Sequence, residues 1–339
     1  MPALNQRPQV NLARSTVLRM WLVFGCALGT VLYSALSDNF SSLALAFFAL
    51  AAGLSAEALA LHFGKLHTYT AAANQDGDKR PGAPGGGLSD GSAAASILIL
   101  VLLLPHAINP VYAVLGAVFA MLLVKYSFGG LGANWVNPAL GAWLFIRFSW
   151  PSLFSGVHPP IPSGGGIDTL LRTFFNRTVF SLTGAELPPG YMELLLGLGT
   201  GGIIADRGLP ILILGTILLT AVQVNRAWIP GLYLAAYGLL VRSFGALPGG
   251  GGLGEGDVLY CLCSGGTLAA AFLLISDPVT GAKTPLGMLF TTTLAAVLAF
   301  LFRYPGGELY GALTAAAMTN ALVPLIRAAE RHLQGDDRR

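Results

Sequence analysis

The sequence predicts an all-α polytopic membrane protein, and three features of its composition lead to that prediction. Hydrophobic residues make up 54% of the chain and charged residues only 10%, whereas a soluble domain carries about 25% charged residues. Mean hydropathy is +0.67. The 44 glycines and 20 prolines suit membrane helices, which contain both more often than soluble helices do. A net charge of only +3 without a long basic run argues against a nucleic-acid partner.

Ten segments are apolar enough to cross a membrane, since a helix needs about 20 mainly apolar residues to do so. They lie near 17–37, 41–63, 91–106, 110–127, 137–155, 208–225, 228–246, 258–276, 284–302 and 308–327. We therefore predict a single membrane domain over 1–339, with a first five-helix half at 17–155, an exterior loop at 156–207, a second five-helix half at 208–327 and a cytoplasmic tail at 328–339. Within that loop, the glycine-rich stretch 192–206 is expected to form a half-inserted or surface helix.

The positions of lysine and arginine predict the orientation. With ten spans and the N-terminus inside, 13 of the 19 basic residues fall on the inner side. These are Arg7, Arg14, Arg19, Lys65, Lys79, Arg80, Lys125, Arg226, Lys283, Arg327, Arg331, Arg338 and Arg339. Cytoplasmic loops of membrane proteins carry such an excess. We thus expect a multi-pass protein of the bacterial inner membrane, in contact with lipid, with both termini in the cytoplasm.

The stretch KYSFGGLGANWVNPALGAWL at 125–144 interrupts two apolar segments. Its glycines and Pro138 cannot continue a helix, and the backbone groups that they free must find partners. At membrane depth such irregular backbone occurs only where it packs on protein or lines a wet cavity. Asn134 and Asn137 are therefore candidate ligands for an ion or the polar edge of a cofactor. The alternative is an ordinary turn in which both amides satisfy local backbone groups.

A short internal repeat accompanies this break. The order Lys125-Tyr126, Gly129-Gly130, Asn137 returns as Arg303-Tyr304, Gly306-Gly307, Asn320. In the ten-span arrangement the two copies lie on opposite sides of the membrane, as in proteins built from inverted repeats. We expect two inverted five-helix repeats with broken helices, and a chance match is the alternative.

Two carboxylates lie in or beside apolar segments. Asp277 precedes a proline at the end of a span, with Thr280 and Lys283 close by, so that Asp277 and Thr280 are candidate ligands for a cation or a flavin edge. Capping of the following turn is the alternative role for Asp277. Glu57 lies within the second span and must face the interior and find a partner there. Ion relay and structural pairing are both open for Glu57.

Four stretches in order resemble a known family. They are LSDGSAAASILILVLLLP at 88–105, KYSFGGLGANWVNPALG at 125–141, LLISDPVTGAKTPLGMLF at 273–290 and TNALVPLI at 319–326. This pattern is similar to the membrane subunit shared by the Rnf complex, as its D subunit, and the sodium-translocating NADH:quinone oxidoreductase, as its B subunit, with the Rnf form the more similar. The resemblance implies ten helices in two inverted halves. It further implies other complex subunits as partners, electron transfer between ferredoxin or NADH and a second acceptor, and coupling to Na⁺ or H⁺ translocation.

Most members of that family carry FMN joined through its phosphate to a threonine of an exterior loop, in a motif Asp-x-x-Ser/Thr-Gly-Ala-Thr/Ser. The matching stretch here keeps Thr183, Gly184 and Ala185 but has Phe180 in place of the aspartate and Glu186 in place of the flavin-bearing threonine. A carboxylate cannot form that phosphoester, and its charge repels the phosphate unless Arg172 or Arg177 compensates. Covalent FMN is therefore not expected at this cofactor site, while non-covalent FMN there and a further non-covalent flavin in the membrane stay open.

Two other functions are consistent with the sequence. A stand-alone permease or channel would also use inverted repeats and broken helices. A scaffold subunit that has lost its flavin would keep the fold without the redox role. The chain has neither a P-loop ending in lysine and serine or threonine nor iron–sulfur cysteine spacing, so any redox chemistry must come from a bound flavin.

Overall fold

All regular structure in the described part of the chain is helical. The computed structural model describes residues 8–73, 90–127, 136–155, 165–178, 186–198, 202–222, 224, 226–277 and 280–333, with the backbone alone at 8–16, 64–73 and 331–333. Within these ranges no strand occurs, and a single β-bridge joins Pro105 to Ile203. The predicted all-α class is confirmed.

Two long helices, α1 and α2, begin the chain and enclose shorter ones. In order, the elements are α1 (Pro8–Ala35), α2 (Ser41–Ala73), α3 (Ser92–Leu102), α4 (Pro110–Phe119), the π-helical η2 (Ala120–Tyr126), α5 (Pro138–Ser149) and the 3₁₀ turn η3 (Pro151–Phe154). Helix α2 packs on α3 and α4, and α1 packs on α3. Helix α3 is thus surrounded by protein, and its residues are almost all buried.

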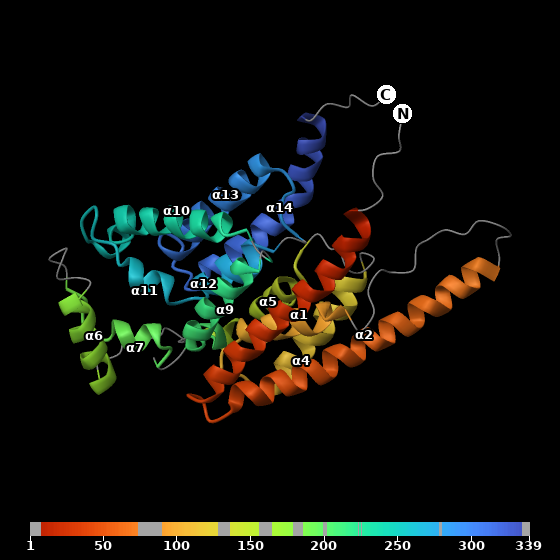
Figure 1. Cartoon of the computed structure of the whole chain (residues 1–339), viewed down its shortest axis with the longest axis horizontal. Helices are drawn as coiled ribbons and strands as arrows, with labels where there is room; N and C mark the ends of the chain where they lie inside the picture. The colour runs from red at the N-terminus through yellow and green to blue at the C-terminus, as the bar shows by residue number, and fades with distance from the viewer. Residues whose placement is uncertain are drawn as a thin grey trace.

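The rest of the described chain mixes short helical elements with longer helices. These elements are α6 (Gly166–Thr178), α7 (Tyr191–Leu195), α8 (Ile204–Arg207), α9 (Leu209–Ala221), α10 (Trp228–Phe244), η5 (Leu247–Gly249), α11 (Val258–Leu262), α12 (Thr267–Ala269), the π-helical η6 (Ala270–Ile275), α13 (Pro285–Arg303) and α14 (Gly311–Leu333). Helix α13 packs on α10 and α14, and α9 packs on α1. The start of α1 and the end of α14 lie at one end of the molecule, and α6 and α7 lie at the other (Figure 1).

Among the described residues, four helices are long and apolar enough to cross a membrane, and they indicate a multi-pass membrane protein. They are Val17–Ala35, Ser41–Phe63, Pro285–Arg303 and Gly311–Glu330. Three shorter apolar helices are Ser92–Leu102, Pro110–Tyr126 and Leu209–Ala221. Large apolar side chains on the outer faces, such as Phe47 (67% exposed) and Phe290 (57% exposed), fit contact with lipid.

Several of the ten predicted spans are short or interrupted. Helix α3 has 11 residues, which at 1.5 Å per residue cover about half of a hydrocarbon core roughly 30 Å thick. The predicted span at 258–276 is broken between α11, which ends at Leu262, and α12, which begins at Thr267. Such broken helices are tolerated at membrane depth when protein surrounds them. The total of ten spans and the inverted repeat stay predictions.

The stretch 192–206, which was expected to form one half-inserted or surface helix, is divided between α7 and α8. Its last residues lie in the core, because Ile203 and Ile204 are fully buried and the Ile204 N–H donates to Leu104 O at 3.0 Å. The surface helix of this region is instead α6, whose Ile167, Leu170 and Phe174 are exposed. The sequence did not indicate this difference because both stretches mix apolar residues with glycines or charges.

Candidate functional site

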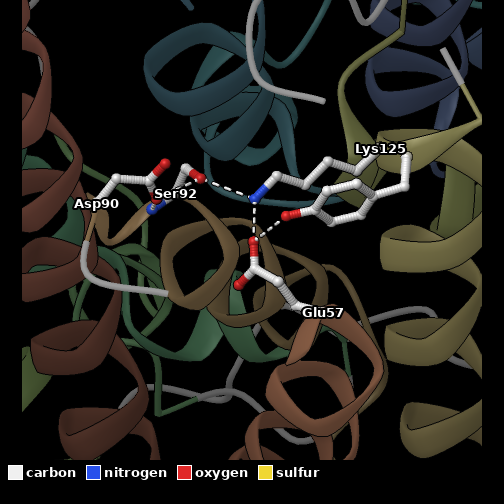
Figure 2. Close-up of polar contacts among 5 residues, drawn as sticks. Glu57, Asp90, Ser92 and Lys125 are labelled. Atoms are coloured by element: carbon white, nitrogen blue, oxygen red, sulfur yellow. Dashed lines mark hydrogen bonds and ion pairs between the residues drawn. The ribbon is translucent and has the colours of Figure 1, made fainter. Parts of the chain in front are cut away.

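A buried ion pair links the middle of α2 to the end of η2. Lys125 Nζ lies 2.6 Å from Glu57 Oε1, and the two side chains are 3% and 1% exposed. Lys125 also donates to Ser92 Oγ at 2.8 Å, and the Tyr126 hydroxyl donates to Glu57 Oε1 at 2.9 Å. Figure 2 shows Glu57 of α2, Ser92 of α3 and Lys125 of η2 pointing toward one another. We call Glu57, Asp90, Ser92, Lys125 and Tyr126 the Lys125 cluster.

The residue just before the cap of α3 contributes the second carboxylate of this cluster. Asp90 Oδ1 accepts from the Ser92 N–H at 2.8 Å and from Ser92 Oγ at 2.7 Å. Gly91 lies between them with φ +73°, a left-handed conformation that favours glycine. The carboxylate thus stands at the positive end of a buried helix, where a negative charge is stabilised.

The charges of the Lys125 cluster do not balance. Its two carboxylates face one ammonium, which leaves a net formal charge of −1. Within the described part of the chain, Glu57 Oε2 and Asp90 Oδ2 are buried and accept no hydrogen bond. An uncompensated buried charge is costly, so the cluster favours binding of a cation or a proton. Carboxylate and hydroxyl oxygens are the ligand types that Na⁺ would find there.

The π-helical turn of η2 helps to place Lys125. Helix α4 begins at Pro110 with Asn109 as its cap and continues into η2 (Ala120–Tyr126), which ends with Lys125 and Tyr126. A π-helical turn contains more residues than an α-helical turn and therefore changes the direction of the side chains that follow it. Lys125 is buried at 2% exposure although it lies in an apolar segment. Such turns occur often at functional sites.

A second buried cation occurs at the end of α13. Arg303 donates to Ser264 O at 2.9 Å, to Ser264 Oγ at 2.6 Å and to Cys261 O at 3.4 Å. Asp206 accepts from the Gly265 N–H at 2.8 Å and from the Gly266 N–H at 3.0 Å. These groups close the gap between α11 and α12. We call Asp206, Ser264, Gly265, Gly266 and Arg303 the Arg303 cluster.

Three of the predicted site residues meet where α5 begins. Asn137 Nδ2 donates to Asp277 Oδ2 at 3.0 Å, and Thr280 Oγ1 donates to the same oxygen at 3.0 Å. Asn137 also caps α5, since its Oδ1 accepts from the Ala139 N–H at 3.0 Å. Asn137 and Thr280 are buried, and Asp277 is partly exposed. The structure therefore brings Asn137, Asp277 and Thr280 together, while Asn134 lies outside the described residues.

The capping alternative and the ligand hypothesis are both compatible with this geometry. Asn137 is a helix cap and Asp277 an acceptor that ties the α5 start to the connection before α13. Asp277 follows η6 (Ala270–Ile275) closely, so a π-helical segment precedes it just as one carries Lys125. The polar group of Asn137, Asp277 and Thr280 offers one amide, one carboxylate and one hydroxyl to a ligand.

The predicted flavin loop contributes one described residue. Thr183, Gly184 and Ala185 lie outside the described part of the chain, and Glu186 is exposed. The next residue is held to α6, since the Leu187 N–H donates to Asn176 Oδ1 at 3.0 Å. Arg172 Nε lies 3.9 Å from Oδ2 of Asp168, which is one turn earlier on α6. The exposed carboxylate at 186 thus lacks the hydroxyl that a phosphoester to FMN requires, and the residue present does not fit covalent attachment.

The sequence indicated Glu57 but not its partners. Lys125 entered the orientation and repeat arguments and, like Asp90, stood inside a quoted stretch, but neither was predicted as a site residue. Asp206 and Arg303 likewise carried no site prediction. The available signal was a charged residue inside an apolar segment, which at membrane depth must face the interior and be paired. Applied to Lys125 and Arg303, the same rule would have predicted that each is buried and paired, but not with which residues.

Comparisons with known proteins agree on one family. A model of the NQR2, RnfD, RnfE family matches residues 3–334. The D subunit of the ion-translocating oxidoreductase complex of Shewanella amazonensis is 30% identical over 82% of this chain and 82% of its own length. The D subunit of the proton-translocating ferredoxin:NAD(+) oxidoreductase complex of Clostridium ljungdahlii is 29% identical over 70% and 72%. The Na(+)-translocating counterpart of Acetobacterium woodii is 28% identical over 70% and 71%.

Proposed function

Because the chain belongs to the NQR2, RnfD, RnfE family, we propose that it is the D-type membrane subunit of an Rnf-type complex. This complex would transfer electrons between ferredoxin and NAD⁺ and couple that transfer to translocation of Na⁺ or H⁺, as the names of its relatives indicate. The other subunits of the complex are its partners. The resemblance inferred from the four sequence stretches is confirmed by the match over 3–334.

The Lys125 cluster is the observation that best supports ion coupling. It is buried among α2, α3 and η2, carries a net formal charge of −1 and has two carboxylate oxygens without hydrogen-bond partners among the described residues. Buried ionisable groups within membrane segments commonly mark ion or proton paths. We assign Glu57 and Asp90 as carboxylates that take up the translocated cation or proton, with Lys125 limiting how tightly they hold it.

A ten-span fold with two inverted halves is part of the proposal. Lys125-Tyr126 ends η2, and Arg303 ends α13 with Tyr304 next to it, which supports the correspondence of the two copies. Asn137 starts α5, whereas Asn320 lies inside α14, so the asparagines do not correspond in position. The start of α1 and the end of α14 share one end of the molecule (Figure 1), as expected for cytoplasmic termini in an inner membrane.

For the cofactor, we propose that this subunit carries no covalent FMN. Glu186 occupies the attachment position and is an exposed carboxylate. The group formed by Asn137, Asp277 and Thr280 could instead contact the polar edge of a non-covalent flavin, which would supply the one- and two-electron chemistry. A denaturing gel viewed under ultraviolet light tests this. A dark band at 35.2 kDa is expected, and a fluorescent band would contradict the proposal.

Transport by the reconstituted complex tests the function itself. Proteoliposomes receive reduced ferredoxin and NAD⁺, and NADH formation and cation uptake are followed together. We expect Glu57→Gln to lower the cations moved per NADH at least tenfold. The control is Glu308→Gln, which removes the more exposed ion pair with Arg147. Wild-type stoichiometry in Glu57→Gln would reject the cluster, and transport by the single chain without reductant would favour a permease.

A further inference from the structure

A cavity of about 280 Å³ lies where α1, the connection from α9 to α10 and the start of α13 meet. Three cationic side chains line it, each from a different element: Arg19 of α1, Arg226 just before α10 and Lys283 just before α13. A fourth, Arg327 of α14, donates to the carbonyl of Gly281, which also lines the cavity. The cavity thus collects positive charge from both parts of the chain.

Carboxylates offset only part of this charge. Asp277 lines the cavity, but its Oδ2 already accepts hydrogen bonds from Asn137 and Thr280. Glu330 accepts a hydrogen bond from Thr284 Oγ1 beside the start of α13. Three cations and one carboxylate, whose charge also acts on Lys283, therefore line the cavity, and Arg327 and Glu330 lie beside it. Like charges within a few ångströms of each other repel, and an anion between them removes that cost.

The surroundings of the individual cations support this reading. Burial, and next the charge of Arg327, lower the pKa of Lys283, and the charge of Asp277 offsets only part of this effect. Among the residues that the structure describes, Arg19 and Arg226 form no ion pair. Arg226 contacts Met288 Sδ at 3.3 Å, which holds its guanidinium over the cavity wall. An added negative charge would stabilise all of these groups.

The surface next to the cavity is apolar and faces outward. On the first turns of α13, Leu286 is 70% exposed, Leu289 45% and Phe290 57%. Trp228 at the start of α10 is 41% exposed. Tryptophan is common at the level of lipid headgroups, and basic pockets between membrane helices bind anionic headgroups. A free phosphate would use the cations but not this apolar border, whereas a lipid would use both.

We propose that this cavity binds the phosphodiester headgroup of an anionic phospholipid, with the acyl chains lying along the exposed apolar residues of α13. Arg19 belongs to α1, whereas Arg226 and Lys283 lie just before α10 and α13. The lipid would therefore connect α1 to the helices that follow α9. This assignment is independent of electron transfer and would hold for a protein with any transport role.

Binding of dihexanoyl phosphatidylglycerol to the full-length chain in detergent tests the proposal. The expected Kd rises at least tenfold in the double variant Arg19→Gln/Arg226→Gln. Arg226→Glu alone, at an exposed position, should give a rise of the same size. The matched control is Arg242→Gln, another exposed arginine, whose guanidinium lies against Gly256 O away from this cavity and whose loss leaves the Kd unchanged.

Three ligand comparisons identify the source of the phosphate. Dihexanoyl phosphatidylcholine, which has the phosphodiester without the net charge, should bind at least tenfold more weakly than phosphatidylglycerol. Inorganic phosphate and FMN should fail to displace the lipid at equal concentration. Equal binding of the two lipids, displacement by phosphate or FMN, or an unchanged Kd in both arginine variants would each overturn the proposal.

Discussion

The Lys125 cluster and the Arg303 cluster share one local arrangement. In each, a short buried helix begins after a glycine with φ +73°, which is Gly91 before α3 and Gly266 before α12. A basic side chain from the end of a later helix, Lys125 or Arg303, donates to a serine near that glycine. In each, a carboxylate accepts backbone N–H groups at that helix start. The two clusters differ in how the remaining charge is treated. The Lys125 cluster has a second carboxylate, Glu57, whereas Arg303 donates to backbone and hydroxyl oxygens.

Because of this difference, the Lys125 cluster has carboxylate oxygens left to bind a cation, whereas those of the Arg303 cluster are all hydrogen-bonded. Asp206 uses both carboxylate oxygens on the N–H groups of Gly265 and Gly266, and Arg303 faces carbonyls that cannot titrate. In the Lys125 cluster two carboxylate oxygens remain without hydrogen bonds in the described part of the chain. Under the proposed function, the same local arrangement has a structural role near α12 and an ion-binding role near α3.

Removal of the buried basic side chain should lower the free energy of unfolding most in the Lys125 cluster. Lys125→Met leaves Glu57 and Asp90 as two buried carboxylates without their ammonium, and breaking a buried pair costs about 3–5 kcal/mol. The double variant Lys125→Met/Glu57→Gln should recover most of that loss. Thermal unfolding can be followed by thiol labelling, because Cys26, Cys261 and Cys263 are all buried. No recovery in the double variant would show that the pair is not the source of the cost.

The Arg303 cluster depends on geometry more than on charge. Arg303→Lys keeps the positive charge but cannot reach Ser264 O, Ser264 Oγ and Cys261 O together, so we expect a loss of about 1–3 kcal/mol from buried acceptors left without donors. The same labelling assay measures it. As a control, Arg147→Lys at the more exposed pair with Glu308 should cost less than about 1 kcal/mol. Equal losses at the two arginines would contradict the assignment.

The sequence predicted the helical class and the need for Glu57 to be paired, because both follow from hydropathy and the cost of charge in a membrane. It could not name Lys125 as the partner, because the two residues are 68 positions apart. Asn137 and Asp277 were each predicted at a helix break, but their contact joins positions 140 apart. Pairing over such separations is set by tertiary packing, which local patterns do not encode.

Helix α3 shows why the spans were harder to predict than the class. Its sequence SAAASILILVL is apolar on all sides, a pattern shared by a full membrane span and by a short helix enclosed in protein. The Asp90-Gly91-Ser92 start and the Pro105 end were visible in the sequence, yet nothing local indicated that α1, α2 and α4 surround the helix. Length and hydropathy alone therefore do not distinguish a continuous span from a short helix enclosed in protein.

The two glycines should respond alike, since both clusters use the same helix start. Gly91→Ala and Gly266→Ala each place a side chain at φ +73°, which costs about 1–2 kcal/mol, and the new Cβ would approach Trp21 at 3.0 Å and Ile203 at 2.9 Å. Gly231→Ala on α10, where the Cβ meets open space, is the matched control and should be neutral or slightly stabilising. A large effect at only one of the two glycines would break the correspondence between the helix starts.

The smallest effect on stability, and the sharpest contrast between clusters, should come from the helix-start carboxylates. Asp90→Asn keeps an oxygen for the Ser92 N–H and removes the surplus charge, so stability should change by less than about 0.5 kcal/mol. Asp206→Asn replaces one of the two accepting oxygens by an NH2 group, so the Gly266 N–H keeps at most its longer 3.3 Å contact to the oxygen that also accepts from Gly265, and this variant should be destabilised. A cation that binds only the folded state raises its stability in proportion to log concentration once the site is saturating. Added Na⁺, or acidification if H⁺ is the ion, should therefore stabilise the wild type and Asp206→Asn but not Asp90→Asn. If Asp90→Asn keeps the full ion response, the cation is bound without Asp90 and the Lys125 cluster is as complete as the Arg303 cluster.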